Sequence, residues 1–125
     1  MKSLFIDGTS ITPNIQFSVD TGLLILEGRS IPENPEDFYL SLIDWLNEYY
    51  ESREGATEIH FKFEYVNSGS TKFLQEFLRL VRKFQDGGKT TMIKWYYEEE
   101  DEAIQELGEH FNDYLKIPME IIPII

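Results

Sequence analysis

The sequence predicts an α/β fold, with one domain over residues 1–125, a mixed sheet, an N-terminal hairpin and helices mainly on one face of that sheet. Strand-like segments come first, and helical and strand-like periodicities then alternate along the chain, which is the pattern of crossover connections between parallel strands. Residues 57–65 alternate apolar and polar side chains, as expected for a strand with one face in solvent. A chain of 125 residues with 42% hydrophobic content can bury one core but not two.

The first half of the chain is predicted to form three short strands and a helix. The strands span residues 4–6, 14–19 and 23–27, and Asp20-Thr21-Gly22 supplies the tight turn that makes the last two a hairpin. A helix over residues 35–54 follows, with Asn34 as its N-cap and Pro35 in its first position. Its apolar residues recur at helical spacing and predict a stripe that faces the sheet: Phe38, Leu42, Trp45, Leu46 and Tyr49.

The second half alternates strand and helix. Strands are predicted over residues 57–65, 90–97 and 119–122, the last closed by Pro123, and helices over residues 70–85 and 101–115. The first of these helices stops at Gly87 and Gly88. Since side chains alternate along a strand, Tyr96 is expected to point away from Trp95 and Tyr97. An outward Tyr96 joins either a binding patch or, more commonly, a second small core.

The charge of the chain limits its partners. Eleven Lys and Arg residues stand against 23 Asp and Glu residues, for a formal net charge of -12. Such a protein repels nucleic acid and anionic membrane surfaces, so we expect no partner of either kind and favour basic protein partners. There is no Cys, which fits a reducing compartment, and we expect neither a signal peptide nor a spanning helix. These features favour a cytoplasmic protein.

Residues that carry catalysis or bind metals are scarce. His60 and His110 are the only histidines, and neither has the spacing of a metal site or a partner nucleophile, so we interpret both as surface or structural residues. The acidic run from Glu98 to Glu102 admits a metal site, but acids at the start of a helix more commonly complement its dipole and stay solvated. We therefore expect no catalytic residue, no metal and no cofactor.

A small hydroxyl-rich turn joins the strand at residues 57–65 to the helix that follows it. Ser68, Ser70 and Thr71 lie where a helix begins, and free backbone N–H groups at such a place favour a phosphate. A phosphate on Ser68 would add about -1.5 to -2 charges there and disrupt an acidic or apolar partner surface. Taken alone, Ser68 or Ser70 is more simply interpreted as an N-cap.

A second loop, over residues 28–35, joins another strand to another helix. Its Arg29 is suited to clamping an anion or a partner carboxylate. The same side chain is equally suited to an internal ion pair with Glu33 or Asp37. The residues leave both interpretations open.

The order of elements, with a hydroxyl after the central strand, resembles STAS domains such as the anti-sigma-factor antagonists. Individual segments are most similar to the SiaC family of regulatory phosphoproteins, and the similarity extends over nearly the whole chain. The loop from Gly28 to Asn34 is its most specific part. The segments that carry the resemblance are Thr12-Pro13-Asn14-Ile15, Gly28-Arg29-Ser30-Ile31-Pro32-Glu33-Asn34-Pro35, Phe38-Tyr39, Asp44-Trp45-Leu46, the turn from Tyr65 to Lys72, and Trp95-Tyr96-Tyr97-Glu98 followed by Asp101 and Gly108.

The resemblance implies a non-catalytic bacterial protein of cyclic di-GMP signalling and biofilm formation. In that family a cognate Ser/Thr protein kinase phosphorylates a hydroxyl in the turn, and a PP2C-type phosphatase removes the phosphate. The unphosphorylated protein binds and activates a diguanylate cyclase, so the implied effector here is such a cyclase or another protein.

The resemblance also assigns roles to individual residues. The family pattern in the turn is Asn, Thr, Ser, Ser, any residue, Lys, so Ser68 takes the position of the phosphate acceptor, with Ser70 and Thr71 as alternatives. The departure is Ser and Gly in place of Thr and Ser. The residues expected to bind partners are Asn67, Ser68, Gly69, Ser70, Lys72, Arg29, Glu33 and Asn34.

A second class of function is a small anion-binding domain or small enzyme that uses the Ser68 turn and Arg29. The chain lacks a Gly-rich phosphate fingerprint, a catalytic triad and metal-ligand spacing, which counts against this class. Intact mass after incubation with ATP and the cognate kinase distinguishes the two classes.

Overall fold

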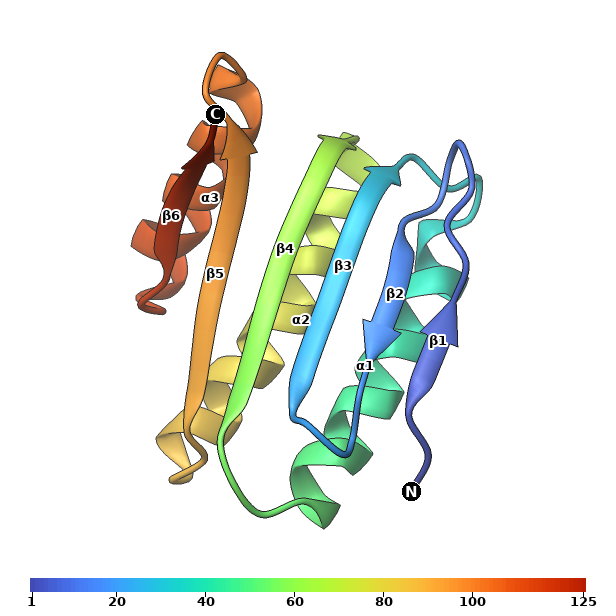
Figure 1. The fold of residues 1–125 in the computed structure, drawn as a ribbon, viewed down its shortest axis with the longest axis vertical. Helices are drawn as coiled ribbons and strands as arrows, with labels where there is room; N and C mark the ends of the chain where they lie inside the picture. Colours follow the sequence, from blue (N-terminus) through green and yellow to red (C-terminus); the bar gives the residue numbers. More distant parts are fainter.

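The computed structural model describes residues 1–125 as one six-stranded sheet with three helices. The helices lie on one face of the sheet (Figure 1), as the sequence predicts. In chain order the elements are β1 (Leu4–Ile6), β2 (Asn14–Phe17), β3 (Leu23–Ser30), α1 (Pro35–Ser52), β4 (Thr57–Val66), α2 (Ser68–Asp86), β5 (Thr91–Glu98), α3 (Glu102–Leu115) and β6 (Glu120–Ile124).

The sheet is mixed, and its strands lie side by side in the order of the sequence. β1, β2 and β3 are antiparallel neighbours, so the predicted hairpin is confirmed. β3, β4, β5 and β6 are parallel neighbours, and each step from one to the next passes through one helix. Since the carboxyl ends of these strands meet at one edge, the loops that lead into the helices gather there (Figure 1).

Several predicted boundaries were wrong: the strand predicted over residues 14–19 ends at Phe17 and the helix predicted over residues 35–54 ends at Ser52. Three other differences have local explanations. α2 begins at Ser68 rather than at residue 70, because Asn67 is its N-cap. β3 continues to Ser30, past a register shift at Gly28. β6 runs through Pro123 instead of ending before it, and it tolerates Pro because it is the outer strand of the sheet, with one side free of strand partners.

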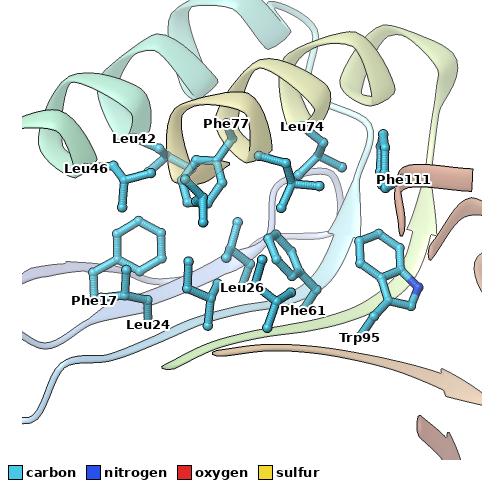
Figure 2. Close-up of a cluster of buried hydrophobic side chains, with 14 of the residues drawn as sticks. Phe17, Leu24, Leu26, Leu42, Leu46, Phe61, Leu74, Phe77, Trp95 and Phe111 are labelled. Carbon is cyan, nitrogen blue, oxygen red and sulfur yellow. The ribbon is translucent and has the colours of Figure 1, made fainter. Parts of the chain in front are cut away.

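The core lies between the sheet and the three helices. Figure 2 shows side chains from α1 and α2 pointing toward side chains from the strands, with Trp95 and Phe111 at one end. In α1 the predicted stripe is partly right. Leu42, Leu46 and Tyr49 are buried, but Phe38 and Trp45 are only half-buried, while α1 also buries two residues outside the predicted stripe, Tyr39 and Tyr50.

Helix α3 packs very closely on β5. A Cβ atom added at Gly108 would lie only 2.5 Å from Cδ1 of Trp95, so only Gly allows this approach. The Trp95 indole is fully buried, and its Nε1 donates a hydrogen bond to the Ile104 carbonyl at 2.9 Å. This contact fixes α3 on the sheet.

The opposite face of the sheet has no helix over it and carries polar side chains. Glu58 lies between Lys94 Nζ and His60 Nε2, each 2.8 Å from the same carboxylate oxygen. The hydrogen bond from Lys94, and after it the one from His60, lowers the pKa of Glu58. As predicted, Tyr96 points away from its neighbours, and its ring lies 5.2 Å from Lys62 Nζ. His60 thus has a structural contact with Glu58. His110 lies on α3 instead, where it is exposed and its ring stacks on Tyr114.

The acidic run forms the connection from β5 to α3. The side chain of Asp101 accepts a hydrogen bond from the Ile104 N–H at 3.1 Å and so caps α3. Glu102 lies in the first turn, where it complements the helix dipole. None of the three helices has both the length and the hydropathy needed to cross a membrane.

Candidate functional site

The two loops singled out by the sequence lie together at the carboxyl ends of β3 and β4. These strands are parallel neighbours, and the Asn67 N–H donates to the Ser30 carbonyl at 3.0 Å. Helices α1 and α2 both begin at this edge (Figure 1). We call the segments Gly28 to Pro35 and Tyr65 to Lys72 together the switch edge.

Asn67 organises the start of α2. Its side-chain Oδ1 accepts a hydrogen bond from the Ser70 N–H at 2.8 Å, which leaves the adjacent Ser68 in the first position of the helix. The Ser68 side chain is exposed. The interpretation of Ser68 or Ser70 as the N-cap is therefore wrong, because Asn67 takes that role.

Ser70 is fully buried in a network of hydroxyl groups. Its Oγ donates to the Ser30 carbonyl at 3.1 Å and accepts from Ser30 Oγ at 2.8 Å. Because the Ser30 proton is used in this bond, the Tyr39 hydroxyl donates to Ser30 Oγ. All three residues are 0% exposed. Burial raises the pKa of Tyr39 to about 12, against the lowering effect of its hydrogen bonds, so Tyr39 is a protonated donor at neutral pH.

Thr71 and Lys72 have different surroundings. The Thr71 Oγ1 donates to the Asn67 carbonyl at 3.1 Å, and its side chain is half-buried. This hydroxyl is thus used within the first turn of α2. Lys72 is exposed, with its Nζ 5.7 Å from the centre of the Phe73 ring.

Arg29 contacts an aromatic ring rather than a carboxylate. The sheet register shifts between Gly28, whose φ is 116°, and Arg29, and such a φ favours Gly. Arg29 is then paired with Tyr65 across the strands, and its guanidinium carbon lies 5.7 Å from the centre of the Tyr65 ring. Of the two interpretations left open by the sequence, the internal ion pair with Glu33 or Asp37 is not formed.

The loop before α1 completes the edge. As predicted, Asn34 caps α1, because its side chain accepts from the Asp37 N–H at 3.3 Å. Gly69 faces Pro35, since a Cβ atom at residue 69 would lie 3.5 Å from the Pro35 ring. Glu33 is exposed beside them. Every residue predicted to bind a partner therefore belongs to this one edge.

Sequence reasoning missed three contributors to the switch edge. Ser30 and Tyr39 form buried hydrogen bonds beneath the turn, and the ring of the exposed Tyr65 contacts the Arg29 guanidinium. One signal was available for Tyr39, since a tyrosine beside a helix N-terminus needs a polar partner when it is buried. The pairing of Arg29 with Tyr65 depends on the register shift at Gly28, which periodicity does not reveal.

A separate hollow of about 330 Å³ opens near the carboxyl ends of β4 and β5. Neither Ser68 nor Arg29 lines it, and four acidic side chains stand there against one lysine, so it does not supply the anion pocket of the alternative function. Its lining is Glu27, Lys62, Phe63, Glu64, Tyr96, Tyr97, Glu98, Asp101 and Ile124.

Comparison with known proteins identifies relatives of the whole chain. Residues 6–124 match the family described as SiaC family regulatory phosphoprotein. The uncharacterized protein PA14_02130 of Pseudomonas aeruginosa is 31% identical over 121 residues, which cover 97% of this chain and 96% of that protein.

Solved structures agree in fold. Apo-SiaC from Pseudomonas aeruginosa is 30% identical with a TM-score of 0.90, and the match covers 98% of this chain and 99% of that one. The same identity and TM-score are found for a crystal structure of the diguanylate cyclase SiaD in complex with its activator SiaC, over 97% of this chain and 99% of that chain.

Proposed function

The chain belongs to the SiaC family of regulatory phosphoproteins, and on this premise we propose that its unphosphorylated form binds and activates a diguanylate cyclase. SiaC of Pseudomonas aeruginosa is described as the activator of the cyclase SiaD in their complex. The family is regulatory, so the protein controls a partner enzyme and is not itself an enzyme. Such a switch acts in the cytoplasm, where a kinase finds ATP.

Ser68 is the proposed phosphate acceptor, and its exposure is the observation that carries the proposal. Of the three candidate residues, only Ser68 is exposed to solvent. Ser70 is fully buried, and Thr71 is half-buried with its hydroxyl donating to the Asn67 carbonyl. A kinase must reach the hydroxyl that it modifies. In that step the γ-phosphoryl group of ATP forms a bond to the Ser68 oxygen, the bond to ADP breaks, and the hydroxyl proton passes to a base of the kinase.

The phosphate would change the charge of the switch edge. It adds about -1.5 to -2 charges at neutral pH, at the first position of α2, where free N–H groups and the helix dipole stabilise it. The same charge opposes an acidic or apolar partner surface docked at this edge. We propose a cognate Ser/Thr kinase and a PP2C-type phosphatase as the enzymes that add and remove it.

Phosphosite mapping tests the assignment. The wild-type chain and three variants, Ser68→Ala, Ser70→Ala and Thr71→Val, are incubated with ATP and the cognate kinase, and intact mass and phosphopeptides are measured. We expect one added phosphate in the wild type and in Thr71→Val, and none in Ser68→Ala. The Ser70→Ala variant should still accept phosphate on Ser68.

The matched variants make the result decisive. A Ser68→Ala chain that is folded and phosphorylated as fully as the wild type would show that another hydroxyl is the acceptor. Loss of phosphate in Thr71→Val, with Ser68→Ala unaffected, would move the site to Thr71.

A further inference from the structure

We propose that Tyr39, acting through Ser30 and Ser70, is a positioning residue that confines phosphoryl transfer to Ser68. This inference rests on the proposed function, because it concerns the regulation of the same turn. It adds a residue of α1 that lies outside the turn.

Each hydroxyl of the network has a fixed hydrogen-bonding role. Ser70 Oγ donates its proton to the Ser30 carbonyl, and Ser30 Oγ donates its proton to Ser70 Oγ. The Tyr39 hydroxyl closes the network by donating to Ser30 Oγ. Ser70 therefore has no proton free for a kinase base and no exposed surface. Phosphorylation there would require opening the contact between α2 and β3.

The network also ties the first turn of α2 to two other elements. The Ser30 carbonyl accepts from both the Asn67 N–H and Ser70 Oγ, at 3.0 and 3.1 Å. Tyr39, which belongs to α1, extends this connection to that helix. Its ring also stacks on the ring of Phe73 in α2, with 6.3 Å between the centroids. Ser68, which lies between Asn67 and Ser70, is thereby held in one position for a kinase.

Tyr39→Phe tests the inference because it removes one hydroxyl and keeps the stacked ring. Tyr49→Phe is the matched control on the same helix. Its hydroxyl is also buried and is paired 2.7 Å from Thr57 Oγ1, and Thr57 starts β4, at the opposite end of the strand from the switch edge. A purely structural role of the hydroxyl would therefore affect both variants alike.

The measurements are kcat/KM for the cognate kinase and the distribution of phosphate among residues 67–72. We expect kcat/KM at Ser68 to fall roughly two- to tenfold in Tyr39→Phe relative to Tyr49→Phe, which corresponds to the loss of one hydrogen bond. Some phosphate should also appear on Ser70 in Tyr39→Phe. Deuterium exchange at the Ser70 and Thr71 amides should be faster in Tyr39→Phe than in Tyr49→Phe, with no kinase present.

Equal kinetics, equal exchange and phosphate on Ser68 alone in both variants would overturn the inference while leaving the proposed function intact. Absence of phosphate from residues 67–72 in the wild type would instead overturn the proposed function. If Tyr39→Phe is unfolded, Ser30→Ala provides the same test, because it removes the hydroxyl that links Tyr39 to Ser70. In that case unchanged kinetics and exchange in Ser30→Ala would contradict the inference.

Discussion

Buried hydroxyls occur at both ends of helix α1. Near its start Tyr39 donates to Ser30, and near its end the hydroxyls of Tyr49 and Tyr50 are each 2.7 Å from a threonine hydroxyl at the start of β4 or β5. Burial raises the pKa of Tyr50 and Tyr39 above the ordinary range, so both stay protonated at neutral pH. These pairs satisfy polar groups that the core would otherwise leave unpaired.

Two glycines have opposite expected responses to alanine. In Gly108→Ala the new Cβ would meet the buried Trp95 indole at 2.5 Å, and we expect a loss of about 1 to 3 kcal/mol in the free energy of unfolding, as in other overpacked cores. In Gly69→Ala the nearest contact would be an ordinary 3.5 Å, and we expect a gain of about 0.4 to 1 kcal/mol. Denaturant unfolding of both variants measures the difference.

Equal free energies of unfolding for Gly108→Ala and Gly69→Ala would contradict the close packing of α3 on Trp95. In particular, a Gly108→Ala chain as stable as the wild type would mean that the indole moves aside. The hydrogen bond from Trp95 Nε1 to the Ile104 carbonyl opposes that movement.

At the scale of elements, each helix begins with a side chain that caps it. Asn34, Asn67 and Asp101 each accept a hydrogen bond from the backbone N–H three residues later. These caps satisfy N–H groups that have no partner within the helix. At α2 the cap places Ser68 in the first position of the helix, where it is exposed, and Ser70 in the third, where it is buried.

Because Asn67 is the cap and Ser68 is not, we predict that alanine at these two positions has different effects on the free energy of unfolding. Asn67→Ala should lower the free energy of unfolding by about 0.5 to 2 kcal/mol, because it leaves the Ser70 N–H without its 2.8 Å acceptor. Ser68→Ala alters an exposed side chain and should stay within about 0.5 kcal/mol of the wild type. Urea titration of the two variants checks the order, and a larger loss in Ser68→Ala would show that Ser68 contributes to the cap.

The elements and their order could be predicted from periodicity and caps, whereas contacts made at a distance could not. Alternation in β4 and the pair Asn34 and Pro35 were sufficient to place a strand and a helix start. Arg29 was harder, because its partner Tyr65 is 36 positions away by residue number and is brought opposite by the register shift at Gly28.

The burial of polar side chains was the other feature that the sequence did not predict. Ser70 looks as accessible as Ser68 in the sequence, but its hydroxyl is inside the fold, and nothing local to the turn distinguishes the two. Tyr39 and Tyr50 were not included in the predicted buried stripe of α1. Both are buried because their hydroxyls are hydrogen-bonded to residues of β3 and β5. The acceptor assignment to Ser68 remains a prediction.

At the scale of the whole molecule, the fold gathers the residues of the proposed switch at one edge. Because β3 and β4 are parallel and adjacent, the loops before α1 and α2 lie side by side, and both helix N-termini are found there. All three helices occupy one face of the sheet (Figure 1). A charge added at Ser68 is therefore placed at an edge that includes Arg29, Glu33 and Lys72, within a protein of net charge -12.

The most direct test of this account is the affinity of the protein for the diguanylate cyclase, measured by calorimetry with serine and with phosphoserine at position 68. The central claim is that phosphate at this one exposed position controls partner binding. We predict at least about tenfold weaker binding of the phosphoserine form, equivalent to about 1.4 kcal/mol. Equal affinity of the two forms, with the phosphoserine chain folded, would contradict the claim.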